Sequence, residues 1–348
     1  MSQHLIFTAE DDFYHKLSDD PYETETNWWS FNIPERKMGG WIHNQYYPNR
    51  KTCTWRVFVW DDRGMSPTDL AYYRKVDEAP MSGDPDLTDI SFPGGGYSLK
   101  MLEPGMKYQL GYSDPARGFA MDFVHTGVHR PHRFEPGEPP FMQTPHFDQL
   151  GHVEGTLRLH GETIAIDGVG VRDRTWGPRG GPYQKSRKKH PADAQRVKHP
   201  GGPLWRQIER ERGRGRIEYI YGHSEDFQTG FLGFVRMQDA DASGWAPMNT
   251  GWLLKDGVFQ PLDKTRSRML NFRDPVGGWN SHMLVDLADT TGRTMEAEGI
   301  SLSRLRDGGM YQLMRWEFDG KVGWGEDQDV WIGAGHFPRM LDALRGAR

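Results

Sequence analysis

Cysteine is nearly absent from this sequence, since Cys53 is the only one among 348 residues. A single cysteine excludes an internal disulfide and a zinc site built from cysteine ligands. Apolar runs are short as well, and none approaches the roughly 18 residues of a membrane-spanning helix. Residues 1–16 lack the basic start and the apolar stretch of a secretory signal. We therefore expect a cytoplasmic protein without a transmembrane segment, and leave peripheral contact with a membrane open.

The sequence also lacks an excess of positive charge, because its formal net charge is -5. That balance argues against a general nucleic-acid-binding protein, so no nucleic-acid partner is expected. Two common catalytic motifs are missing too. The glycine-rich residues 93–96 are not followed by the Lys-Ser/Thr of a P-loop, and no G-x-S-x-G motif occurs. The sequence implies no cofactor and does not indicate the oligomeric state.

Aromatic residues and glycine are what the sequence has in quantity. Aromatic residues make up 12% of the chain, with 13 tryptophans, and there are 42 glycines. Such a composition favours strands joined by tight turns. Both faces of residues 52–60 are apolar, as in a barrel or sandwich strand, and no strand–helix alternation is visible. We predict an all-β fold of two lipocalin-like (calycin) barrel or sandwich domains packed together.

The domain organisation is expected from changes in composition along the chain. A proline-rich region leads up to residue 145, so we expect an N-terminal β domain at 1–145 and a C-terminal one at 146–335. A short amphipathic helix is predicted at 336–348. Residues 180–202 contain six lysines and arginines against one acid, which indicates a mobile basic loop. A solvated surface excursion is the simpler interpretation of this loop, and a lid or a patch for an anionic partner is the alternative.

The densest cluster of charged and aromatic residues lies in residues 144–179. Strands are expected at 152–159 and 163–171, and the glycine-containing break between them indicates a hairpin. The segment RDRTWGPR at 172–179 then places arginines, an aspartate and a tryptophan at a strand end. Charged groups packed so closely either form a buried network or face a ligand.

This RDRTWGPR segment, with the DGVG before it, resembles the two-lipocalin-domain family around carotenoid 1,2-hydratase (hydroxyneurosporene synthase). Weaker similarities lie at 146–149 (HFDQ), at 23–31 (ETETNWWSF) and at 323–326 (GWGE). The resemblance implies two calycin-like barrels with a pocket for a lipophilic small molecule. Related folds include fungal phytoalexin hydratases and pericyclase-type cyclases.

A hydratase acting on an isolated alkene needs a positioned acid, a stabilised carbocation and a water molecule, but no metal or organic cofactor. A buried carboxyl group kept neutral by desolvation can donate the proton, and aromatic faces can stabilise the cation. Asp173 is the first candidate acid, because alternation from Val169 and Val171 places it on their face. The alternative is a structural network in which Arg172, Arg174 and Arg179 pair with Asp173 and lower its pKa.

Other candidates carry weaker signals. His223, with Glu218 upstream on the same strand, could act in acid–base chemistry or position a water, and a solvated histidine at the rim is the alternative. Asp286 is a candidate inward-facing carboxylate. The candidate substrate-binding residues are Trp28, Trp29, Arg172, Trp176, Tyr219, Tyr221 and His146. Packing in the core is the alternative for each of the aromatic residues.

Four histidines, His125, His129, His132 and His146, invite comparison with a metal site. Spacings of three and four residues would suit zinc ligands on a helix, but Pro131 indicates a loop. No cysteine or close acidic ligand completes the set. We therefore expect linker histidines and no metal site.

Three functional hypotheses follow from the sequence. The first is a cofactor-independent lyase (hydratase) or isomerase/cyclase acting on a hydrophobic terpenoid- or polyketide-like substrate. The second is a non-catalytic carrier of lipophilic ligands, and the third is an interaction module that uses the basic loop. A carboxyl group that faces the pocket without an arginine partner would distinguish the enzyme from the carrier.

Overall fold

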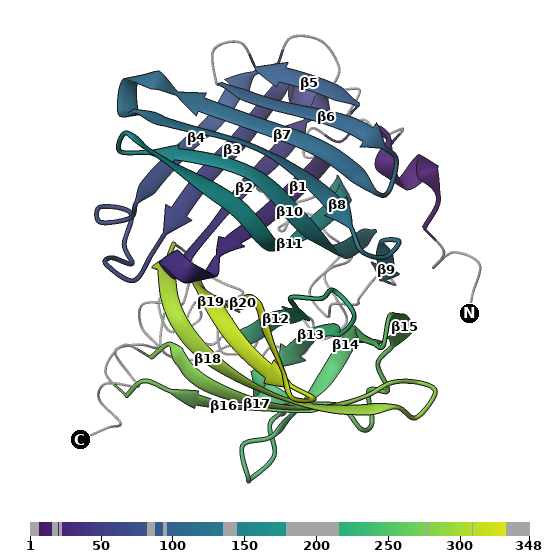
Figure 1. Ribbon diagram of the computed structural model, residues 1–348. Helices are drawn as coiled ribbons and strands as arrows, with labels where there is room; N and C mark the ends of the chain where they lie inside the picture. Colours follow the sequence, from purple (N-terminus) through teal and green to yellow (C-terminus); the bar gives the residue numbers. More distant parts are fainter. Residues whose placement is uncertain are drawn as a thin grey trace, which may run out of the picture.

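In the computed structural model the protein consists almost entirely of β-strands, arranged as two sheets stacked one above the other (Figure 1). The structure describes residues 7–15, 20, 23–81, 88–92, 96–134, 145–178, 216–275, 278–307 and 309–331. The predicted all-β fold of two barrel-like units is therefore confirmed. The basic loop at 180–202 and the helix expected at 336–348 lie outside the described residues. Within the described part, no helix is long and apolar enough to cross a membrane.

The first sheet is an open half-barrel of antiparallel strands in the order β4-β3-β2-β1-β11-β10-β8-β7-β6-β5, with the short β9 paired to β10. Its strands are β1 (Glu23–Ile33), β2 (Met38–Tyr47), β3 (Thr52–Trp60), β4 (Tyr72–Pro80), β5 (Asp89–Phe92), β6 (Tyr97–Glu103), β7 (Lys107–Asp114), β8 (Phe119–Gly127), β9 (His132–Phe134), β10 (His146–Leu159) and β11 (Glu162–Pro178).

The second sheet closes on itself. Its order is β13-β12-β20-β19-β18-β17-β16-β14-β15, and pairing of β13 with β14 completes a barrel of eight strands. Its strands are β12 (Arg216–Ser224), β13 (Gly230–Arg236), β14 (Ala246–Lys255), β15 (Val258–Pro261), β16 (Arg268–Arg273), β17 (Asn280–Ala288), β18 (Thr294–Arg306), β19 (Met310–Phe318) and β20 (Lys321–Trp331).

The hairpin β10–β11 belongs to the first sheet, although we expected it to open the second barrel. β11 pairs with β1, and β10 pairs with β8. β1 is buried along its whole length, so its backbone groups need a strand on each side. Gly170 permits the close approach of β11, because a Cβ atom there would clash with the carbonyl oxygen of Ser30. The two sheets therefore divide between Pro178 and Arg216 rather than at residue 145.

An apolar layer joins the two sheets. One buried cluster fills the half-barrel and another fills the closed barrel, while a third contains residues of both sheets. Trp28 and Val171 enter this shared layer from the first sheet, and Tyr221 and Phe234 enter it from the second. Because side chains alternate along a strand, β11 presents one face to this layer and the other to the interior of the half-barrel. The layer is thus where residues of the two sheets meet.

Candidate active site

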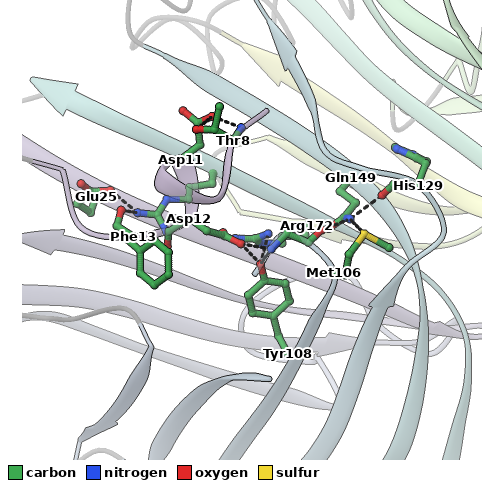
Figure 2. A network of polar contacts seen from close by, with 12 residues as sticks. Thr8, Asp11, Asp12, Phe13, Glu25, Met106, Tyr108, His129, Gln149 and Arg172 are labelled. Atoms are coloured by element: carbon green, nitrogen blue, oxygen red, sulfur yellow. Dashed lines mark hydrogen bonds and ion pairs between the residues drawn. The ribbon is translucent and has the colours of Figure 1, made fainter. Parts of the chain in front are cut away.

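The two arginines beside Asp173 point into the half-barrel, on the opposite face of β11. Arg172 pairs with the carboxylate of Asp12, which lies in a short 3-10 turn near the N-terminus (Figure 2). The hydroxyl of Tyr108 accepts a hydrogen bond from Arg172 (2.7 Å) and donates one to Asp12. The backbone N–H of Gly105 also donates to Asp12. These contacts fix the N-terminal turn inside the half-barrel.

Burial by itself would raise the pKa of Asp12, but the charges of Arg172 and Arg174 outweigh it and hold the pKa below its usual value. Arg174 also donates to Glu25 (2.8 Å) and to the backbone oxygen of Asp12 (2.7 Å). The buried charge network that the sequence suggested therefore exists, but its acids are Asp12 and Glu25. The hypothesis that Asp173 pairs with these arginines is wrong.

Asp173 lies on the inter-sheet face instead, next to His146 and Asp148. The register of β10 and β11 places Asp148 directly opposite Asp173, and His146 opposite Thr175. His146 Nε2 is 3.1 Å from Asp148 Oδ2, and His146 Nδ1 is 3.0 Å from the Thr175 hydroxyl and 3.9 Å from Asp173 Oδ2. The Asp148 side chain is fully buried, whereas that of Asp173 is 26% exposed. Among the described residues, neither aspartate forms an ion pair with arginine or lysine.

Burial raises the pKa of Asp148 to about 6, against the opposing effect of the neighbouring His146. The negative charge of Asp173 raises it further, and the Tyr219 hydroxyl lowers it. Neither Asp148 Oδ1 nor the Tyr219 hydroxyl oxygen completes a hydrogen bond, although both are buried. Asp148 therefore carries one oxygen that is free to accept a proton from a bound molecule.

A second buried carboxyl group without an arginine or lysine partner among the described residues, Glu326 on β20, enters the same layer from the second sheet. Glu326 lies opposite Tyr221 of β12, and the Tyr221 hydroxyl is 2.8 Å from the Ser30 hydroxyl of the first sheet. Burial raises the pKa of Glu326 to about 8. Gln328 donates to its Oε2 at 3.3 Å, and its Oε1 has no partner. Glu326 is therefore protonated at neutral pH and able to donate.

Tyr219 lies near enough to both carboxyl groups for each to affect its pKa. Burial raises its pKa well above the usual value, and the charges of Asp148, Asp173 and Glu326 all add to that effect. The Tyr219 and Tyr221 rings meet edge to face with centroids 6.0 Å apart. The layer between the sheets thus combines two buried carboxyl groups, one histidine and two tyrosines.

Five residues predicted from the sequence meet at this inter-sheet site. They are Trp28, His146, Asp173, Tyr219 and Tyr221. Trp28 is directly opposite Asp173 in the pairing of β1 with β11.

The other predicted residues lie elsewhere. Arg172 and Trp29 are inside the half-barrel, with the guanidinium 5.0 Å from the centre of the indole ring. Trp176 stacks on His15, with ring centroids 4.1 Å apart. Asp286 faces outward, because its neighbours Val285 and Leu287 point into the closed barrel. It forms an ion pair with Arg268 (2.7 Å), and both residues line a surface hollow of about 840 Å³. The expectation of an inward-facing carboxylate there is wrong.

His223 and Glu218 cannot act together. They are five residues apart on β12, so their side chains point to opposite faces of the sheet. Glu218 points into the closed barrel, where Asn271 and Arg273 donate to it at 3.1 and 2.9 Å. His223 packs on Phe227 and contacts the backbone oxygen of Ser224 at 3.0 Å.

Sequence reasoning missed Asp148 and Glu326 as candidate catalytic residues. A signal for Asp148 was present in the HFDQ segment, because His146 and Asp148 are two residues apart and must share a face of a strand. Glu326 ends the GWGE segment, but nothing local distinguishes it from an exposed acid. The groups around its carboxyl, among them Tyr221 and Ser30, come from other strands.

Of the other histidines singled out from the sequence, His125 and His223 are buried, whereas His129 and His132 are partly buried. Burial lowers the pKa of His125 and His132 to about 3 and that of His129 and His223 to about 4. Within the described residues, the group with metal-ligand spacing is a different one: atoms of His146, Asp148 and Asp173 all lie within 4.8 Å of one another. These three residues could hold a cation, or could act together in proton transfer.

We expect the buried histidines to make the protein sensitive to acid. His129 is neutral in the folded protein but protonates near pH 6.5 when unfolded, so stability is lost as the pH falls from about 6.5 towards 4. Within that window, one such histidine lowers the free energy of unfolding by about 1.4 kcal/mol for each pH unit. Urea unfolding at pH 7.5, 6.5 and 5.5 measures how the free energy of unfolding depends on pH. In His129→Gln this dependence should be weaker by the equivalent of about one proton taken up on unfolding. An unchanged slope in that variant would contradict the expectation.

Comparison with known proteins shows the fold but not the chemistry. One family model, described as a domain of unknown function (DUF7064), matches residues 8–189. A search of curated proteins finds no match. Kievitone hydratase from Nectria haematococca is 11% identical with a TM-score of 0.51, covering 95% of each chain. CghA is 12% identical with a TM-score of 0.53, covering 92% of this chain and 91% of its own, and CghA with Sch210972 is 11% identical with a TM-score of 0.52, covering 90% of each.

Proposed function

Since the chain belongs to the DUF7064 family, whose description assigns no activity, we propose a function from the site itself. The protein is a cofactor-independent acid–base enzyme, either a hydratase-type lyase or an isomerase/cyclase. One observation carries this proposal: Asp148 and Glu326 enter the same buried layer from opposite sheets, and neither forms an ion pair with arginine or lysine among the described residues. Pairs of titratable groups held in different protonation states are typical of acid–base catalysis.

The roles of the two groups follow from their protonation. In a hydration, protonated Glu326 donates its proton to an alkene carbon, leaving a carbocation. The aromatic faces of Trp28 and Tyr219 stabilise that cation. Asp148, oriented by its 3.1 Å contact with His146, takes a proton from the water whose oxygen bonds to the cation. One water is added overall, and the proton gained by Asp148 returns through solvent to Glu326. A cyclisation uses the same acid and base without the added water.

The surroundings of the carboxyl groups support a hydrophobic substrate of the terpenoid or polyketide kind. Phe134 stacks near His146, and Phe234 packs on Tyr219 with centroids 4.5 Å apart. Kievitone hydratase, by its name, performs a hydratase reaction on this fold, which makes the proposed chemistry compatible with the architecture. At 11% identity, the similarity does not indicate which substrate this protein uses.

A carrier would use the same apolar layer differently. Its pocket would be apolar, with few buried acids, since an unpaired buried carboxyl group costs stability and adds no affinity for a lipophilic ligand. Asp148 and Glu326 favour the enzyme for this reason.

The proposal is tested by a thermal-shift screen of isoprenoid, sterol and polyketide-like compounds, followed by mass analysis of each hit after incubation. We expect a product that has gained one water or is an isomer of the hit. Asp148→Asn should bind the same hit but lower turnover by about 10²-fold, because the base is lost while water can still reach Asp173. Asp286→Asn, on the outside of the closed barrel, is the matched control and should turn over normally.

Three results would count against the proposal. Full turnover by Asp148→Asn would remove that residue from the mechanism. Binding of every hit without any product would favour the carrier. Loss of turnover after EDTA treatment, with recovery on adding a divalent cation, would assign His146, Asp148 and Asp173 to a metal.

A further inference from the structure

A crevice of about 480 Å³ opens between the two sheets, and none of the buried carboxyl groups of the site is among its lining residues. Val169 of β11 lines it from the first sheet, and Phe227 and Trp324 line it from the second. Its volume lies in the range of small-molecule sites, about 300–1,000 Å³. All three of these residues also belong to, or pack against, the apolar layer that contains the proposed active site.

Glu326 lies next to the lining of the crevice. Trp324 and Glu326 are two residues apart on β20, so they share a face and lie about 7 Å apart along the strand. Val169, Val171 and Asp173 follow one another in the same way along β11. A molecule seated in the crevice would therefore meet Glu326 before it meets the aspartates.

Phe227 is held over the crevice at a conformational cost. Its φ of 55° is in the left-handed region, which glycine and asparagine adopt far more readily than phenylalanine. The turn is fixed by hydrogen bonds from Ser224 to Thr229 and to Asp226. Backbone strain of this kind is enriched at binding sites, where the side chain serves the ligand.

The charged groups that line the crevice are all acidic. They are Glu35, Asp167 and Glu225, and no lysine or arginine is among the described lining residues. Glu225 accepts a hydrogen bond from the indole N–H of Trp324 (3.1 Å), and Asp167 is 2.7 Å from His152. Exposed carboxylates around an apolar floor repel anions and can accept hydrogen bonds from hydroxyl groups.

We propose that this crevice binds the non-reacting part of the substrate, a flat, uncharged aromatic or cyclic hydrophobic group that carries hydroxyl donors, and excludes anionic analogues. Its use for part of the substrate rests on the proposed function, but binding of such a ring compound in the crevice does not. Phe227 and Trp324 contact the ring, and Glu225 and Glu35 set the preference for uncharged molecules.

Two ring compounds of matched shape test the proposal: 2-naphthol, which is uncharged at pH 7, and 2-naphthoate, which is an anion. We expect calorimetric titration of the full chain to give binding of 2-naphthol and about tenfold weaker binding of 2-naphthoate, because the rim carboxylates repel the anion. Phe227→Asn should weaken 2-naphthol binding about tenfold while unfolding at nearly the same temperature, since relief of backbone strain offsets the lost ring contacts. Glu35→Gln/Glu225→Gln should bring the two affinities together.

Phe272→Ala is the control, because Phe272 is an exposed aromatic residue of β16, away from the crevice. Equal binding of 2-naphthol by wild type and Phe227→Asn, or an equal loss in Phe272→Ala, would overturn the proposal. So would a preference for the anion. Crevice binding in a protein that turns over no hit would leave this inference standing and remove the proposed function. If the enzyme turns over a substrate and Phe227→Asn leaves its KM unchanged, the proposed function stands and the inference about the crevice is wrong.

Discussion

Asp12→Ala is expected to lower the free energy of unfolding by about 3–5 kcal/mol, the usual cost of removing one partner of a buried ion pair. Arg172 would keep its charge in the half-barrel interior, where its side chain is 1% exposed. The Tyr108 hydroxyl and the Gly105 N–H would lose their shared acceptor in the same step. Urea unfolding at pH 7 measures the change.

Two further variants make the result interpretable. Asp62→Ala removes an exposed ion pair with Lys37 and should cost far less, because solvent screens that pair. Asp12→Leu combined with Arg172→Met replaces both charges by apolar groups and should recover much of the loss. A small effect of Asp12→Ala, similar to that of Asp62→Ala, would show that the N-terminal turn does not stabilise the half-barrel.

The fold class was predictable because strand signals are local. Alternating apolar residues and glycine turns mark a strand wherever it pairs in space. The partner of a strand is not local, and β11 illustrates this. The contact between Trp28 and Asp173 joins positions far apart in the chain, and the proline-rich stretch before residue 145 suggested a break between domains. The hairpin β10–β11 was therefore predicted correctly as a hairpin and assigned to the wrong sheet.

At the site, too, the local pattern was predictable and the distant partners were not. Alternation from Val169 correctly predicted the face of Asp173, and it also places Arg172 and Arg174 on the other face. Closeness in sequence suggested a pairing of these arginines with Asp173, but residues next to each other on a strand point to opposite faces. Their actual partner, Asp12, is brought in by the N-terminal turn, which carries no sequence pattern linking it to β11.

Glu326 could not be identified from sequence for a related reason. A carboxyl group becomes a neutral acid through the loss of water around it, and that depends on every element packed against it. Here the surrounding groups come from β1, β12 and β20, including Ser30 and Tyr221. The residue type was visible, but its environment exists only in the assembled pair of sheets.

Glu326→Gln should therefore separate activity from stability. Turnover of any substrate identified for the enzyme is expected to fall by about 10²–10⁴-fold, since the amide keeps the shape of the side chain but cannot donate the proton. Glu317→Gln, an exposed position on β19, is the matched control and should retain full turnover. Substrate binding should persist in both variants, which a thermal-shift titration would show.

Glu326→Gln should lose activity but gain stability relative to wild type. The ordinary pKa of a glutamate is 4.5, and burial raises that of Glu326 to about 8, so between these values folded protein holds a proton that unfolded chain has released. Wild type therefore loses stability through Glu326 as the pH rises from about 4.5 to 8, and Glu326→Gln does not. The advantage of the variant in urea unfolding should grow from pH 6 to pH 8. Asp148, with a pKa of about 6, also titrates in this range, but it is present in both proteins and its contribution cancels in the difference. A variant that keeps its turnover, or whose stability relative to wild type is independent of pH, would show that Glu326 is not the buried acid of this site.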